Sequence, residues 1–185
     1  MKIFFDTEFT ELSKNGQLIS IGMISEDNKE FYAELNDIES TKVSEWIKEN
    51  VLDNTINYGT LIPKEILDDE TNYVVGSKED IKIALEEYLD QFEEVELISD
   101  VCHYDMVYLI DIFGTAFDLP KNVNPACHDI NQDIANYENI TEIEAFDRNR
   151  EDFIFTYNTE VDGVKHNSLY DAKVIKEIYE ITNAR

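Results

Sequence analysis

The chain has 185 residues, with 41 Asp and Glu residues against 15 Lys and Arg residues and a formal net charge of −26. Such a surface repels polyanions at long range and argues against tight, non-specific binding to duplex nucleic acid, which needs several cationic contacts to phosphates. It does not exclude an enzyme that holds a strand end through divalent cations, because a bound cation reverses the local field.

The remaining composition is typical of one globular domain, and we expect a single domain over residues 1–185. Hydrophobic residues make up 43% of the chain and aromatic residues 11%. No apolar run approaches the roughly 20 residues needed to cross a bilayer, and the start of the chain is too soon acidic for a signal peptide. The 2 cysteines, Cys102 and Cys127, do not make a disulfide framework, which favours a reducing cytoplasm.

The first half of the chain contains three short apolar segments separated by turn residues. They predict strands at residues 2–6, 18–24 and 30–35, which short links would join into an antiparallel meander. Residues 41–50 can form a helix. Residues 51–76 mix apolar and acidic residues with Pro and Gly, and predict loops with short elements.

The second half alternates helices and strands, which predicts an α/β fold with a mixed sheet. Ser77 is the expected N-cap of an amphipathic helix whose apolar spacing continues to Phe92. The other predicted elements are a strand at 95–99, a helix at 105–113 ending at Gly114, a short strand at 126–130 leading into a helix through about 145, and a final helix after Asn167.

Asp6 and Glu8 follow the first apolar strand. Two residues apart on a strand, their side chains point to the same face. They would lie at a strand end, where open α/β sheets place their ligands. Like charges this close repel each other unless a cation lies between them, so the pair predicts ligands for Mg²⁺ or Mn²⁺. Alone, the pair could equally form a solvated turn.

Asp105, His166 and Asp171 lie at two further places that suit such a site. Asp105 begins a helix directly after the fourth strand, and His166 and Asp171 lie five residues apart where the last helix starts. Because helical side chains one turn apart share a face, His166 can lean over the site that Asp171 lines. Each residue alone could be a helix cap, a surface acid or a loop histidine, but together they favour a metal site.

These segments resemble the three motifs of the DEDD 3′–5′ exonuclease superfamily, the ribonuclease T and proofreading-exonuclease group. The motifs are Phe5–Phe9, Tyr104–Leu109, and His166 with Asp171. Asn167 stands where the tyrosine subgroup has Tyr, so the chain resembles the histidine (DEDDh) subgroup. It is most similar to small bacterial and phage exoribonucleases of the ribonuclease AS type. Leu18–Gly22, Phe113-Gly114 and Cys127–Ile130 support that similarity.

The second motif departs from the common form. Many relatives carry His-Asn five and four residues before the motif aspartate, where this chain has Asp100 and Val101. Asp100 is therefore a second candidate for the carboxylate of this motif. We prefer Asp105, because the aromatic residue before it and the apolar spacing after it match the family better.

The resemblance implies a ribonuclease H-like mixed sheet, antiparallel in its first three strands and then parallel, flanked by helices. It implies a 3′–5′ exoribonuclease that hydrolyses single-stranded RNA ends to nucleoside 5′-monophosphates, and a homodimer. Two divalent cations, Mg²⁺ or Mn²⁺, would be held by Asp6, Glu8, Asp105 and Asp171. His166 would be the general base, a task that suits a side chain titrating near neutral pH.

The substrate contacts are predicted from position alone. Phe9 could stack on a base or belong to the core, and Thr10 could offer a hydroxyl or backbone N–H. Arg148, Arg150 and Lys165 form the one basic cluster near the third motif, and either contact phosphates or are solvated.

Two other functions fit the same residues. The substrate could be single-stranded DNA with the same mechanism. The chain could also be a non-catalytic, acidic interaction protein on the same scaffold, with its surface imitating nucleic acid.

Overall fold

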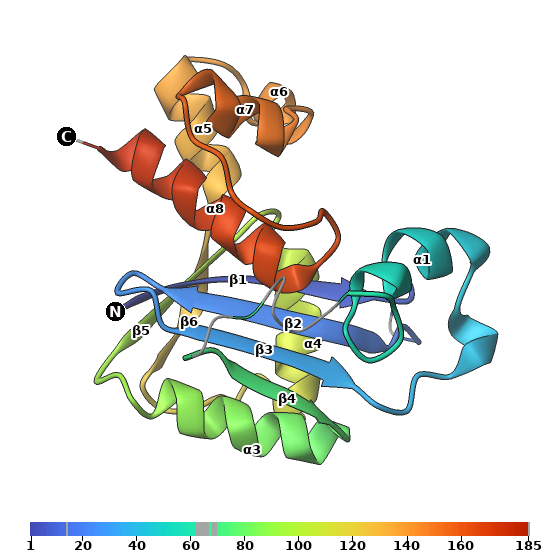
Figure 1. The fold of residues 1–185 in the computed structure, drawn as a ribbon. Coiled ribbons are helices and arrows are strands. Elements are labelled where there is room, and N and C mark those ends of the chain that lie inside the picture. Colours follow the sequence, from blue (N-terminus) through green and yellow to red (C-terminus); the bar gives the residue numbers. More distant parts are fainter. Residues whose placement is uncertain (14, 62–66, 68–69, 185) are drawn as a thin grey trace.

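A six-stranded sheet with strand order β4-β3-β2-β1-β5-β6 forms the centre of the protein (Figure 1). The computed structural model describes residues 1–13, 15–61, 67 and 70–184. The strands are β1 (Lys2–Phe9), β2 (Leu18–Ser25), β3 (Glu30–Leu35), β4 (Asn72–Gly76), β5 (Val95–Ser99) and β6 (Val123–Asp129). The α-helices among the described residues are α1 (Glu45–Asn50), α3 (Lys78–Leu89), α4 (His103–Phe113), α5 (Ile130–Glu138), α6 (Glu142–Phe146), α7 (Arg150–Thr156) and α8 (Ser168–Asn183).

The predicted mixed sheet is confirmed. β1, β2 and β3 pair antiparallel, whereas β5 pairs parallel to β1 and β6 parallel to β5. β4, which pairs parallel to β3 at the sheet edge, falls in the segment predicted as loops with short elements. This strand is short and half-exposed, so it lacks the long apolar run that marks a central strand. Residues 62–66 and 68–69 of the same predicted loop segment lie outside the described residues.

Helix caps decide where the predicted helices begin and end. The helix predicted at 41–50 is a 3₁₀ turn followed by α1, which starts at Ser44 because the Ser44 side chain accepts the Ile47 N–H. The helical stretch predicted to run to about residue 145 ends early, at Asn139, whose backbone is left-handed (φ 55°). A capping box between Thr141 and Glu144 then starts α6.

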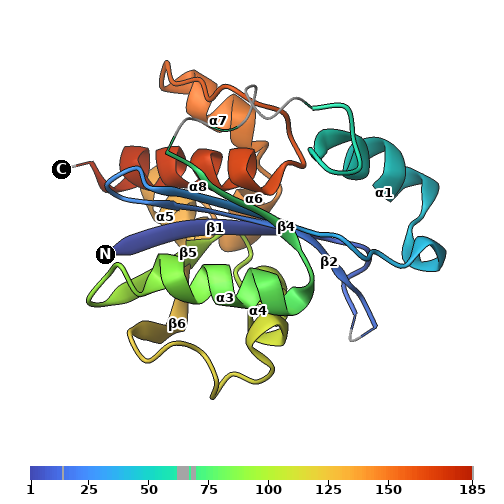
Figure 2. The same ribbon diagram turned by 60° about the horizontal axis from the view of Figure 1, so that its bottom comes forward.

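The sheet has helices on both faces (Figure 2). One face packs on α3 and α4, and the other on α5, α7 and α8. Along β1, Ile3 and Phe5 contribute to the first core and Phe4 to the second. By the alternation of a strand, Asp6 and Glu8 face α8, whereas Thr7 faces α4.

The first turn of α8 lies directly on β2. A Cβ atom at Gly22 would lie 2.3 Å from the backbone nitrogen of Leu169, so only glycine permits this approach. Beside it, the buried hydroxyls of Ser20 and Ser168 are 2.9 Å apart. Gly22 is the register partner of Asp6 in β1. The close packing therefore brings the start of α8 beside Asp6.

No helix in the part of the chain that the structure describes is long and apolar enough to cross a membrane.

The contact at Gly22 gives a first prediction. Gly22→Ala should lower the free energy of unfolding by about 1–3 kcal/mol, because the added methyl group meets backbone atoms that cannot rotate away. Urea denaturation in EDTA measures this change. Unchanged stability would mean that α8 does not depend on the close approach.

Candidate metal site

A pocket of about 210 Å³ lies where β1 meets the start of α8. Four of the predicted site residues, Asp6, Glu8, His166 and Asp171, line it together. One ligand atom from each of Glu8, His166 and Asp171 lies within 4.8 Å of the other two. The Nδ1 atom of His166 is 3.5 Å from Oε1 of Glu8. One ion could therefore reach all three residues.

Asp6 is half-buried and lies among other carboxylates. Burial raises the pKa of Asp6 well above its ordinary value, and the charges of Asp105, Asp171, Glu8 and Asp100 raise it further. A buried anion surrounded by anions is costly unless it is protonated or paired with a cation. The donor set consists of the carboxylate oxygens that Mg²⁺ and Mn²⁺ prefer, so these residues fit a divalent cation.

Asp171 is similar. Burial, and next the charge of Glu8, raise the pKa of Asp171 well above its ordinary value. The backbone N–H of His166 donates to Oδ2 of Asp171 at 2.9 Å, which lowers that pKa. The charge of Glu151 raises it and that of Lys165 lowers it, so both side chains act on the site.

Asp105 lies beside this pocket and is only 3% exposed. Its Oδ1 atom accepts the backbone N–H of Thr7 at 3.0 Å and the Thr7 hydroxyl at 2.7 Å, and its other oxygen accepts the Ser99 hydroxyl. The pairing of β1 with β5 ends at Phe4, so Asp105 occupies the place where β5 has left β1. Burial raises its pKa to about 7, against the lowering effect of these hydrogen bonds.

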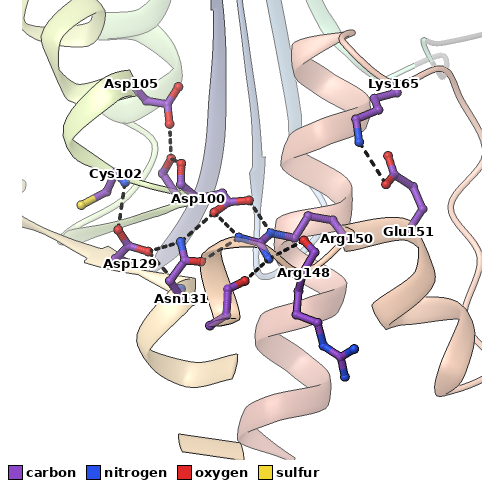
Figure 3. Close-up of polar contacts among 11 residues, drawn as sticks. Asp100, Cys102, Asp105, Asp129, Asn131, Arg148, Arg150, Glu151 and Lys165 are labelled. Atoms are coloured by element: carbon purple, nitrogen blue, oxygen red, sulfur yellow. Dashed lines mark hydrogen bonds and ion pairs between the residues drawn. The ribbon is translucent and has the colours of Figure 1, made fainter. Parts of the chain in front are cut away.

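Asp100, the alternative for the second motif, is neutralised (Figure 3). Arg150 forms a bidentate pair with it, with Nε 2.5 Å from Oδ2 and Nη2 2.8 Å from Oδ1. The side chain of Asn131 donates to Oδ1 at 2.8 Å. Asp100 lines the pocket and Asp105 does not, but Asp100 already has a cation. Asp105 as the ligand of the second motif therefore stays a prediction.

Val101, between Asp100 and the start of α4, has a left-handed backbone (φ 54°). A β-branched residue is strained in this conformation, which Asn adopts more easily. Val101 stands where many relatives of the motif have Asn. The replacement of Asn by Val therefore strains the backbone at this position.

The backbone at His166 is held from several sides. His166 itself is left-handed (φ 64°). The next residue, Asn167, is fully buried, caps α8 by accepting the Tyr170 N–H, and donates to the hydroxyl of Tyr32 and the carbonyl of Asn54, each at 3.0 Å. Asn54 in turn donates to the Lys165 carbonyl at 2.9 Å. This network fixes the turn that presents the imidazole.

Comparison with known proteins agrees with this geometry. Residues 1–182 match the family described as the 3′–5′ exoribonuclease Rv2179c-like domain. The chain belongs to this family. Two relatives, the 3′–5′ exoribonucleases Rv2179c and MT2234.1 of two Mycobacterium tuberculosis strains, are 33% identical over 125 residues, which is 66% of this chain and 67% of each relative. The predicted family and enzyme class, a 3′–5′ exoribonuclease, are therefore confirmed.

Solved structures of low identity share the fold. S. pombe Pop2p, in a form with Mg²⁺ and Mn²⁺ bound, is similar with a TM-score of 0.63 and 15% identity, over 100% of this chain and 83% of that chain. The nuclease domain of 3′hExo, a DEDDh member bound to rAMP, has a TM-score of 0.61 and 12% identity, over 99% of this chain and 92% of that chain. The predicted ribonuclease H-like fold is confirmed.

The structure assigns internal packing to the two predicted substrate contacts of this family member. The ring of Phe9 stacks on that of Tyr108, with centroids 4.5 Å apart and 14° between planes. Thr10 is buried and closes the β1–β2 hairpin through two hydrogen bonds with Gln17. Neither residue lines the pocket of the carboxylates. Contact of Phe9 or Thr10 with RNA stays a prediction.

Sequence reasoning missed the residues that hold the predicted ones in place. Trp46, which is 54% exposed on α1, meets the imidazole of His166 edge-on with ring centroids 5.4 Å apart. Thr7 and Ser99 hold Asp105, and Asn54 holds the turn of His166. An Asn directly after the histidine, at the start of the last helix, was the one sign of this second network in the sequence.

The raised pKa of Asp105 gives a prediction on stability. Its ordinary pKa is 3.8 and its pKa in the fold is about 7. The folded protein therefore binds this proton more tightly, and its contribution to stability is complete below pH 4 and lost as the pH rises through 7. Without metal, Asp105→Asn should be more stable than the wild type at pH 8, on the order of 2 kcal/mol, and equal to it at pH 4.

Urea denaturation in EDTA at both pH values measures the difference. Asp111→Asn, an exposed aspartate of α4 that pairs with Lys78, is the matched control for the change of charge. Equal pH dependence in wild type and Asp105→Asn would show that Asp105 has an ordinary pKa in the fold.

Proposed function

We propose that the protein is a metal-dependent 3′–5′ exoribonuclease that releases nucleoside 5′-monophosphates from single-stranded RNA. The observation that carries the proposal is the convergence of Asp6, Glu8, His166 and Asp171 on one pocket, with Asp105 buried beside it. The 3′–5′ direction and the RNA substrate rest on the family and on the names of the relatives.

Asp6, Glu8, Asp105 and Asp171 would hold two divalent cations, Mg²⁺ or Mn²⁺. The cations, when bound, would supply an activated water and stabilise charge on the scissile phosphate and the leaving oxygen. The protein contributes the carboxylates in fixed positions. Thr7 and Ser99 orient Asp105, and the His166 amide orients Asp171. These hydrogen bonds also favour the ionised forms that a cation requires.

His166 would act as the general base that takes the proton from the attacking water. Its imidazole lines the pocket, beside Glu8 and edge-on to the ring of Trp46. The Asn167–Asn54 network limits the motion of its backbone. A base held in this way loses little freedom when the substrate arrives, which is what efficient proton transfer requires.

The proposed activity is tested with RNA oligonucleotides labelled at either end, with Mg²⁺, with Mn²⁺ and in EDTA. We expect successive shortening from the 3′ end, nucleoside 5′-monophosphate products and no reaction in EDTA. Asp6→Asn and Asp171→Asn should each slow hydrolysis at least about a thousandfold, because the cations lose a ligand. Asp111→Asn should retain full activity.

A DNA oligonucleotide of the same sequence tests the alternative substrate. Faster shortening of DNA would make the protein a deoxyribonuclease with the same site. If neither oligonucleotide shortens, and a basic partner is retained by both wild type and Asp6→Asn, the protein is an interaction protein on a nuclease scaffold. The homodimer, the single domain and the cytoplasmic location expected from the sequence stay predictions.

The role of His166 is tested separately. His166→Ala should slow hydrolysis by about 10²–10⁴-fold, the usual contribution of a general base, while the thermal stabilisation by Mn²⁺ is largely kept. His103→Ala, an exposed histidine at the start of α4, is the matched control. An equal loss of Mn²⁺ affinity and of rate in His166→Ala would mean that His166 is a ligand and not the base.

A further inference from the structure

Three basic side chains come from the segment around the third motif, and the structure separates them. Arg150 and Lys165 line the pocket of the carboxylates, whereas Arg148 does not. Arg148 pairs with Glu138 at 2.6 Å, and its guanidinium points away from the cluster in Figure 3. A substrate phosphate at the pocket can therefore meet only Arg150 or Lys165 among the described cationic residues that line it.

Arg150 has no N–H left for a substrate. A guanidinium has five N–H groups. Nε and one N–H of Nη2 donate to Asp100, and the second N–H of Nη2 donates to Asn131 at 2.7 Å. Both N–H groups of Nη1 donate to carbonyls, those of Ala145 at 2.7 Å and Arg148 at 3.0 Å. Binding a phosphate would leave Asp100 without its cation.

Lys165 is in the opposite situation. Its ammonium has three N–H groups, and in the described structure it is recorded with one acceptor, Oε2 of Glu151 at 3.2 Å. The two side chains are 50% and 31% exposed, and both line the pocket. Exposed pairs of this kind are weak and exchange partners readily. The Lys165 ammonium can therefore turn to a stronger anion.

The main chain of Lys165 is fixed although its side chain is not. Asn54 holds the Lys165 carbonyl, and the next residue is His166. A phosphate that reaches the ammonium is thus close to the candidate base. The carboxylates and their cations would take the scissile phosphate. A neighbouring phosphate would then meet Lys165, because the guanidinium of Arg150 is already paired with Asp100.

We propose that Lys165 binds a phosphate of the RNA strand in this pocket, and that Glu151 competes with that phosphate for the Lys165 ammonium. The proposal rests on the proposed function for the identity of the strand. It assigns a substrate contact to Lys165 and an opposing role to Glu151.

Removal of the lysine tests the first half. Lys165→Gln should raise the KM for a short RNA about tenfold with kcat within about twofold of wild type, and Lys165→Arg should restore most of the KM. The dependence of log Kd on log salt should change by about 0.7, the contribution of one phosphate contact on a single strand. Arg148→Gln changes the net charge equally and should leave KM near that of the wild type.

Removal of the competing carboxylate tests the second half. Glu151→Gln should lower the KM severalfold. Glu138→Gln, which frees Arg148 outside the pocket, controls for the loss of one negative charge. If Glu151→Gln and Glu138→Gln have equal effects, or Lys165→Gln equals Arg148→Gln, the proposal is overturned.

Binding measured in an Asp171→Asn background separates this proposal from the proposed activity. The Kd of a fluorescent single-stranded RNA is measured in that background for Lys165→Gln, Arg148→Gln, Glu151→Gln and Glu138→Gln. If Lys165→Gln raises the Kd, Glu151→Gln lowers it and the two controls leave it unchanged, while the wild-type protein hydrolyses no RNA, the Lys165 contact is supported and the nuclease activity is refuted. Hydrolysis with four equal Kd values would refute the Lys165 contact alone. If the RNA binds neither the wild-type protein nor Asp171→Asn, both the nuclease activity and the Lys165 contact are refuted.

Discussion

The mutual repulsion of carboxylates that are buried or half-buried is the constraint around which this protein is arranged. Asp6, Asp105 and Asp171 come from a strand and two helices that lie on opposite faces of the sheet, and burial raises the pKa of all three. Gly22 allows α8 to come close enough for Asp171 to join the group. Protonation or a partner of opposite charge would offset this cost, so we expect bound divalent cations to stabilise the fold.

The same constraint explains how a chain of net charge −26 can receive a polyanion. The two cationic side chains that line the pocket, Arg150 and Lys165, have different roles. Arg150 neutralises Asp100 and so joins the loop before α4 to the start of α7, while Lys165 remains exchangeable through one exposed contact. The bound cations would supply the rest. Affinity for RNA would then depend on a few local charges and not on a basic surface.

The sequence alone was enough to select candidate site residues at the ends of strands and helices. It was not enough to predict the residues that hold them in position. Asp6 follows a continuous apolar run and Asp171 follows an N-cap, both of which are local patterns. The bonds of Asn54 to Lys165 and of Arg150 to Asp100 span long separations, which no local period encodes. β4 was missed for a related reason, because an edge strand needs little apolar surface of its own.

The edge contact between Trp46 and His166 has a practical consequence. Trp46 is the single tryptophan of the chain, so all indole emission from the protein originates beside the imidazole. The indole therefore reports on the immediate surroundings of this histidine, in the unlabelled chain and without any turnover.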